Sequence, residues 1–97
     1  DQILRYYAVH HELPPAWLDE GLDSQHIAFE KGFRAAFHPP HAVYFPTEEI
    51  LCPEGRACLT RLSDHPQDLT AVDWGHLTAP ASRYLIGHLA RQIFVLP

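Results

Sequence analysis

Residues 69–78 read Leu-Thr-Ala-Val-Asp-Trp-Gly-His-Leu-Thr, and they connect a strand-like segment to the start of the last amphipathic stretch. Asp73 and His76 lie three positions apart in this loop, and Gly75 supplies the backbone freedom that such a turn often needs. At that spacing the Asp73 carboxylate can accept the Nδ1 proton of His76, which leaves Nε2 available as a general base. The alternative is a histidine at a helix start beside a solvated aspartate, and the spacing alone leaves both interpretations open.

Apolar residues that recur every three or four positions predict helices before and after this loop. The helix after it spans residues 79–94, with Thr78 as its cap. The longer helix before it spans residues 24–37; Asp23 and Ser24 are both suitable caps, and we interpret Ser24 as a cap. The expected apolar faces hold Phe29, Phe33, Ala36 and Phe37 in the earlier helix and Leu85, Ile86, Leu89, Ile93 and Phe94 in the last one. Shorter helical segments are expected within residues 1–12 and 47–51.

Short apolar segments between the helices predict strands. Residues 42–45 form a compact apolar and aromatic run bounded by Pro46. A wholly apolar strand so soon after a helix is typical of a parallel strand buried in an α/β sheet, so we predict a three-layer α/β fold. Residues 57–62 and 69–72 are strand-like with a polar turn between them, which predicts a peripheral hairpin. Residues 17–22 are apolar without a regular period and predict a loop that packs against the core.

The composition describes one small globular unit. The chain has 97 residues, of which 46% are apolar and 20% are charged. Twelve acidic and seven basic side chains give a net charge of −5, and the basic residues are scattered, so a nucleic-acid partner is not expected. Eight histidines would reverse the sign of the charge in acid. No apolar stretch approaches the roughly 20 residues of a membrane helix. The start at Asp1 and the lack of methionine indicate a piece of a longer protein.

Cys52 and Cys58 are the only cysteines, and they flank a short segment that contains Pro53 and Gly55. An even number of cysteines in a chain with a thin core favours a disulfide, which implies an oxidising compartment. Two buried free thiols, or half of a zinc site with His65 as a further ligand, are the competing interpretations. No fourth zinc ligand is evident, so no metal site is predicted.

Residues 73–85 resemble the C-terminal block of SGNH hydrolases, in particular the SGNH domains attached to integral-membrane O-acyltransferases that modify cell-surface polysaccharides. In that block the pattern Asp-x-x-His-Leu-Ser/Thr is followed, two or three residues later, by a last helix that starts with small residues. A second match lies upstream, where a strand and a short turn lead into Leu51-Cys52-Pro53 and then Cys58. The resemblance covers about residues 27–94.

The resemblance implies roles for individual residues. Asp73 and His76 would be two members of a Ser-His-Asp triad. The resemblance also favours a disulfide between Cys52 and Cys58. Trp74, beside the general base, either lines an acyl or sugar pocket or simply covers the loop, and the sequence leaves these two interpretations open. Ser24 lacks the preceding strand that the nucleophile of such an enzyme needs, which supports its interpretation as a helix cap.

The resemblance also implies that the chain is one part of a larger domain. The Gly-Asp-Ser block that carries the nucleophile in this family has no counterpart in residues 1–97. We therefore expect the C-terminal portion of a single three-layer SGNH (flavodoxin-like) domain, with a peripheral hairpin and a final amphipathic helix, inactive by itself. Half of such a sheet leaves apolar faces uncovered, so the rest of the parent domain or a self-associated copy would be needed to cover them.

The function that the resemblance implies is acyl transfer that acts on the O-acyl groups, in most cases acetyl groups, of cell-surface polysaccharide. The enzyme would be either a transferase or an esterase. The serine would come from outside this chain, the partners would be an acyl donor and a glycan acceptor, and no cofactor is expected. The location would be the periplasmic or extracellular face, with tethering to a membrane through upstream segments. The alternative is a noncatalytic glycan-binding or pH-responsive interaction module.

Overall fold

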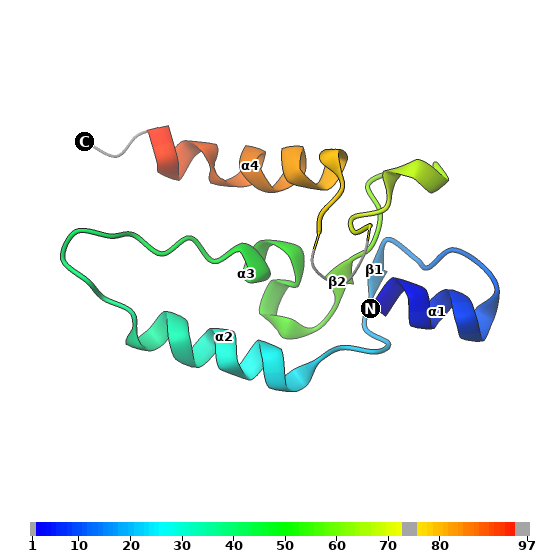
Figure 1. Cartoon of the computed structure of the whole chain (residues 1–97), viewed down its shortest axis with the longest axis horizontal. Coiled ribbons are helices and arrows are strands. Elements are labelled where there is room, and N and C mark those ends of the chain that lie inside the picture. Colours follow the sequence, from blue (N-terminus) through cyan, green and yellow to red (C-terminus); the bar gives the residue numbers. More distant parts are fainter. Residues whose placement is uncertain (1, 73–75, 95–97) are drawn as a thin grey trace.

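The structure is a computed structural model that describes residues 2–72 and 76–94 (Figure 1). Four α-helices and two short strands are connected by loops and 3-10 turns. The described elements are α1 Gln2–His10, β1 Trp17–Leu18, α2 Ser24–Ala36, α3 Thr47–Leu51, β2 Cys58–Leu59 and α4 Ala79–Phe94, with 3-10 turns at Pro53–Gly55 and Pro66–Asp68. This combination of helices and a small sheet is consistent with part of an α/β fold.

The two longer predicted helices are confirmed as α2 and α4, but the cap of α2 differs from the prediction. Asp23, with an extended backbone, accepts a hydrogen bond from the His26 N–H at 3.0 Å. Ser24 is instead the first helical residue. The reason is positional, because a cap must lie outside the helix for its side-chain oxygen to reach an N–H in the first turn. Thr78 caps α4 as predicted, since its Oγ1 accepts from the Ala81 N–H at 3.2 Å.

The buried face of α4 is narrower than its apolar pattern predicts. Its buried residues are Ala81, Leu85 and Leu89. The predicted core residues Ile86, Ile93 and Phe94 are exposed. One row of residues spaced by four is buried because α3 packs against only one side of α4.

The centre of the fold is the segment that was predicted to be a peripheral hairpin. β2 pairs antiparallel with β1, with Trp17 opposite Leu59 and Leu18 opposite Cys58. The Thr60 N–H donates to the Ala16 carbonyl at 2.8 Å, and the Thr60 carbonyl accepts from the Thr70 N–H at 2.8 Å. Leu18, Leu59, Thr60 and Thr70 are all buried. The hairpin is therefore central, because the N-terminal segment pairs with its outer edge.

Residues 42–45, the predicted buried parallel strand, do not form a strand. They are extended, and Val43 is 59% exposed. A strand needs a neighbouring strand to satisfy its backbone groups, and within the described residues none lies beside this segment. The only sheet in the described part of the chain is the antiparallel pair β1–β2, so the predicted three layers are not assembled there.

Cys52 and Cys58 form a disulfide, which is one of the interpretations that the sequence left open. Cys52 follows α3 and Cys58 begins β2, and their sulfur atoms are 2.04 Å apart. The closed loop lies against α2 at Gly55, where a Cβ atom would be 2.8 Å from Ile27 Cγ2. Gly55 also has a φ of +66°, so glycine is required here for both conformation and space. The disulfide thus joins α3 to the central sheet.

The chain leaves much apolar surface exposed. Its radius of gyration is 14.7 Å, whereas a self-contained domain of this length has one of about 12.5 Å. Its accessible surface is 7002 Å², compared with about 5,700 Å² for a folded monomer of this mass. Large apolar side chains contribute to the excess, including Leu4, Val9, Phe29, Val43, Val72 and Phe94. Exposed apolar residues are therefore numerous, and they are distributed over α1, α2, α4 and the loops between them.

We predict that reducing the disulfide lowers the free energy of unfolding by about 2 kcal/mol, because the loop it closes is short. Mass analysis of the alkylated, unreduced protein should show no modified cysteine. The Cys52→Ala and Cys58→Ala double variant should unfold at the same denaturant concentration as the reduced protein. Free thiols in protein isolated from its own cell compartment would contradict the pairing.

We predict that Thr60→Val lowers the free energy of unfolding by about 1–2 kcal/mol, because a buried carbonyl loses its donor. Thr60 is 1% exposed, and its hydroxyl donates a hydrogen bond to the Pro15 carbonyl at 2.6 Å. Thr47→Val is the matched control, since Thr47 is exposed and its side chain caps nothing. Urea unfolding of both variants measures the difference, and equal midpoints would argue against a structural role for this hydrogen bond.

Candidate active-site loop and the adjoining hollow

The loop that carries the Asp-x-x-His motif is closed at its base by hydrogen bonds between its two arms. The Thr78 N–H donates to the Thr70 carbonyl at 3.0 Å, and the Val72 N–H donates to the His76 carbonyl at 3.0 Å. Ala71 and Leu77 form an antiparallel bridge between these two bonds. Because Thr70 is buried and bonded to the central sheet, the loop is a short projection from a rigid base.

His76 is exposed at this projection, directly before the capped start of α4. The Thr78 hydroxyl donates to the Leu69 carbonyl at 2.6 Å and accepts from the first turn of α4, so one side chain holds both the loop and the helix. Asp73 and Trp74, the predicted partner and the predicted pocket residue, lie outside the described residues. The predicted contact between Asp73 and His76 Nδ1 therefore remains a prediction.

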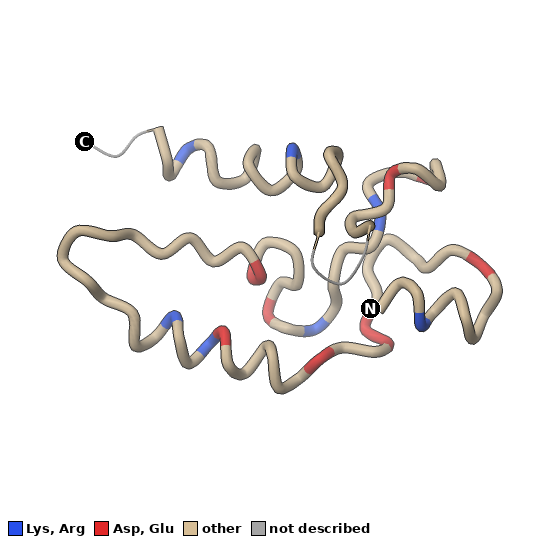
Figure 2. Tube along the Cα trace, in the orientation of Figure 1, with Lys and Arg blue, Asp and Glu red and all other residues tan. Residues whose placement is uncertain are grey.

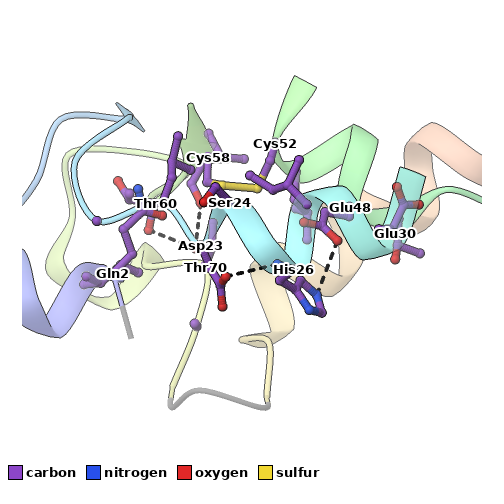
Figure 3. Close-up of a pocket in the computed structure, with 18 of the residues that line it drawn as sticks. Gln2, Asp23, Ser24, His26, Glu30, Glu48, Cys52, Cys58, Thr60 and Thr70 are labelled. Atoms are coloured by element: carbon purple, nitrogen blue, oxygen red, sulfur yellow. Dashed lines mark hydrogen bonds and ion pairs between the residues drawn. A yellow bond between two sulfur atoms is a disulfide. The ribbon is translucent and has the colours of Figure 1, made fainter. Parts of the chain in front are cut away.

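A hollow of about 1100 Å³ adjoins the base of this loop (Figure 3). Thr70 and Ala71 of the loop's first arm line it on one side. The start of α2, the helix α3 and the disulfide line the other sides, as do residues of α1. The hollow is wide open, and its polar lining residues include Gln2, Asp23, Ser24, His26, Glu30 and Glu48.

The strongest electrostatic feature of the hollow is the pair formed by His26 and Glu48. His26 Nε2 lies 3.3 Å from Glu48 Oε2, and the Glu48 side chain is 19% exposed. Burial raises the pKa of Glu48, and the nearby His26 opposes that increase only in part. The carboxylates of Glu30 and Asp23 raise this pKa further. The hollow therefore holds a carboxyl group that gains a proton more readily than an ordinary glutamate.

Ser24 and His26 do not form a nucleophile and base pair. They are two positions apart on α2, where side chains diverge by about 200° instead of facing each other. Figure 3 shows the Ser24 hydroxyl and the His26 ring pointing in different directions. The described part of the hollow thus contains acidic and histidine side chains without an activated serine.

The histidines outside the hollow and the loop lie on the surface. His10 is paired with Glu20 at 3.0 Å and packs on Tyr6. His38 and His41 are exposed, and His88 packs on Tyr84. Among the described residues no three His, Cys, Asp or Glu side chains are grouped so that they could hold a metal ion. Figure 2 shows that the Lys and Arg residues are spread along the chain instead of gathered in one stripe.

Sequence reasoning missed two tertiary contacts beside the hollow. Glu48 meets His26 across 22 positions of sequence, and Tyr44 donates to Glu30 Oε1 at 2.5 Å across 14 positions. The hydrogen bond to Glu30 raises the pKa of Tyr44 above its ordinary value. Neither pair has a local spacing signal, because each joins α2 to a residue outside that helix, in the following loop or in α3.

The described elements and the projecting loop define a small disulfide-bonded α/β unit, and its structure is similar to part of a periplasmic acetyltransferase domain. The similar structure is the periplasmic domain of the Salmonella ser. Paratyphi A lipopolysaccharide acetyltransferase, with a TM-score of 0.78 and 33% identity. The match covers 95% of this chain but only 35% of that one, so the chain spans about a third of its length. No protein-family model and no curated protein matches the chain. In the described residues, no helix has both the length and the apolar character needed to cross a bilayer.

We predict that Glu48→Gln raises the melting temperature at pH 7. The folded state holds the Glu48 pKa above its unfolded value, so the associated stability is fully present below about pH 4.3 and is lost as pH rises through the folded pKa. The neutral glutamine removes this loss. The difference between variant and wild type should therefore be largest near neutral pH and should vanish below about pH 4.

Glu54→Gln serves as the matched control, because the Glu54 side chain is 66% exposed and faces only Arg56. Its melting temperature should follow that of the wild type at every pH. A Glu48→Gln variant that melts below the wild type at pH 7 would show that the ion pair with His26 outweighs the cost of burial.

Proposed function

We propose that residues 1–97 are the C-terminal portion of an SGNH-type acyl-transfer domain that acts on O-acyl groups of cell-surface polysaccharide. The observation that carries this proposal is the 33% identity over 95% of the chain to the periplasmic domain of a lipopolysaccharide acetyltransferase. The Asp-x-x-His-Leu-Thr run at residues 73–78 and the Cys52–Cys58 disulfide support it independently of that match. A disulfide is also what a periplasmic or extracellular location favours.

In this proposal His76 is the general base and Asp73 is the residue that orients it. A serine outside this chain attacks the acyl carbonyl carbon while His76 Nε2 takes the hydroxyl proton. The tetrahedral intermediate collapses, His76 returns the proton to the leaving oxygen, and the acyl group stays on the serine. A sugar hydroxyl or water then attacks this ester, and His76 again takes and returns a proton. Asp73 stabilises the imidazolium in each step.

The fixed base of the loop suits this chemistry. A general base works only within hydrogen-bond distance of the proton that it removes, so its backbone must be held in place. Thr70 and Thr78 hold the two arms through bonds to Leu59 and Leu69, which belong to the central region. The exposure of His76 leaves the imidazole on the surface that a serine from another segment could approach.

A noncatalytic, pH-responsive interaction module is the second candidate. Two histidine and glutamate pairs favour it, His10 with Glu20 and His26 with Glu48, because the attraction in each pair strengthens when the histidine is protonated. Such a module would need neither Asp73 nor His76. The two candidates are separated by activity measurements on variants of the loop.

We predict that His76→Ala, in the natural polypeptide that contains these residues, lowers acyl transfer at least about 1,000-fold. Asp73→Asn should lower it less, because the base remains present in a less favourable orientation. His88→Ala is the matched control, since His88 is an exposed histidine on α4 outside the loop. Transfer of radiolabelled acetyl to polysaccharide measures all three.

Circular dichroism would establish that each variant is folded. A folded His76→Ala variant with wild-type acyl transfer would disprove the assignment and favour the interaction module. The coding sequence upstream of Asp1 gives a further test, because the proposal requires a Gly-Asp-Ser block there.

A further inference from the structure

The two arms of the loop that carries the Asp-x-x-His motif are paired, and their register places one side chain beside the proposed general base. Ala71 and Leu77 are antiparallel bridge partners. The next residues toward the tip of the loop are Val72 and His76, and the Val72 N–H donates to the His76 carbonyl at 3.0 Å. Val72 and His76 are therefore directly opposite each other.

This register decides which side chains share a face of the loop. Side chains directly opposite each other in an antiparallel pair point to the same face, with their Cβ atoms about 5 Å apart. Val72 and His76 thus share one face, while Ala71 and Leu77 point to the other, because side chains alternate along each arm. Val72 is 69% exposed, and His76 is exposed as well. A single exposed valine is ordinary, so the position beside the imidazole is what indicates a role.

The chemistry of the proposed function places the acyl group close to this face. A general base must lie about 3 Å from the hydroxyl oxygen whose proton it removes. The carbonyl carbon of the acyl group becomes bonded to that same oxygen in the covalent intermediate. The atoms attached to the carbonyl carbon are therefore neighbours of the His76 imidazole, and a side chain directly beside His76 is within their reach.

The apolar character of Val72 selects which part of the substrate it contacts. A sugar hydroxyl or a water molecule placed against a valine would lose hydrogen bonds, which costs free energy. The alkyl part of the acyl group has no such cost. The valine side chain is also branched at Cβ and has restricted rotamers, and its backbone is fixed by the hydrogen bond to His76. Val72 can therefore act as a wall of constant position.

We propose that Val72 is a specificity-determining residue, whose side chain packs against the alkyl part of the acyl group and restricts it to short chains. The inference rests on the proposed function, because it requires His76 to be the general base. It adds a residue of this chain that selects the acyl group, whereas Asp73 and His76 would act on any acyl chain that fits.

The test is the hydrolysis of p-nitrophenyl acetate and p-nitrophenyl butyrate by the natural polypeptide that contains residues 1–97. The serine oxygen forms a bond to the carbonyl carbon, the bond from that carbon to the phenolic oxygen breaks, and coloured p-nitrophenolate leaves. Water then cleaves the acyl-serine ester and releases the carboxylic acid. The wild type should prefer acetate. Val72→Ala should raise kcat/KM for butyrate relative to acetate at least about 5-fold, and Val72→Ile should lower this ratio.

Val9→Ala is the matched control, because Val9 is also 69% exposed but lies on α1, outside the loop. It should leave the ratio unchanged. An unchanged ratio in both Val72 variants would overturn the proposal. An equal loss of activity on both esters together with a lower melting temperature would also overturn it, because Val72 would then pack against other polypeptide. A Val72→Ala change confined to KM for the polysaccharide acceptor would place Val72 against the acceptor and would overturn it too.

The same assay separates this inference from the proposed function. A wild type that hydrolyses neither ester, or a folded His76→Ala variant that hydrolyses both as well as the wild type, would contradict the proposed function and with it the role of Val72. A wild type whose activity depends on His76, but whose preference does not respond to Val72, would contradict only the role of Val72.

Discussion

The structure depends on the hydrogen bonds around one buried threonine, Thr60. Its N–H donates to Ala16 and its hydroxyl to Pro15, so the N-terminal third of the chain is attached to the middle. Its carbonyl accepts from the backbone and the side chain of Thr70, so the middle is attached to the loop before α4. A buried polar group without these partners would cost free energy, and this constraint brings together three segments that are distant in sequence.

The position of the candidate catalytic loop follows from this arrangement. Thr70 ends the central region and begins the loop, and Thr78 ends the loop and caps α4. The loop between them therefore has little freedom at its base, while His76 stays accessible. A rigid element that presents an exposed histidine is what a general base requires, because its nucleophile must approach within hydrogen-bond distance.

The same chain is well connected in its centre and poorly covered at its periphery. The disulfide and the threonine hydrogen bonds stabilise the centre without a large apolar core, which matches the small number of fully buried residues. At the periphery, apolar residues of α2, α4 and residues 42–45 remain in water. Exposed apolar surface of this extent is typical of interaction sites.

The sequence by itself determined the local features. These are the spans of α2 and α4, the cap at Thr78, the possibility of a disulfide between the two cysteines, and the Asp-x-x-His motif. These depend on residues within one or two helical turns of each other, so their pattern is readable along the chain. Only the tertiary structure decided that the hairpin is central, that Ile86 and Phe94 are exposed, that Asp23 caps α2, and that Glu48 meets His26. Each of these depends on which distant segment lies alongside. Residues 42–45 show the limit, because their composition predicts a buried strand, whereas burial requires a neighbouring strand and none of the described residues forms one beside them.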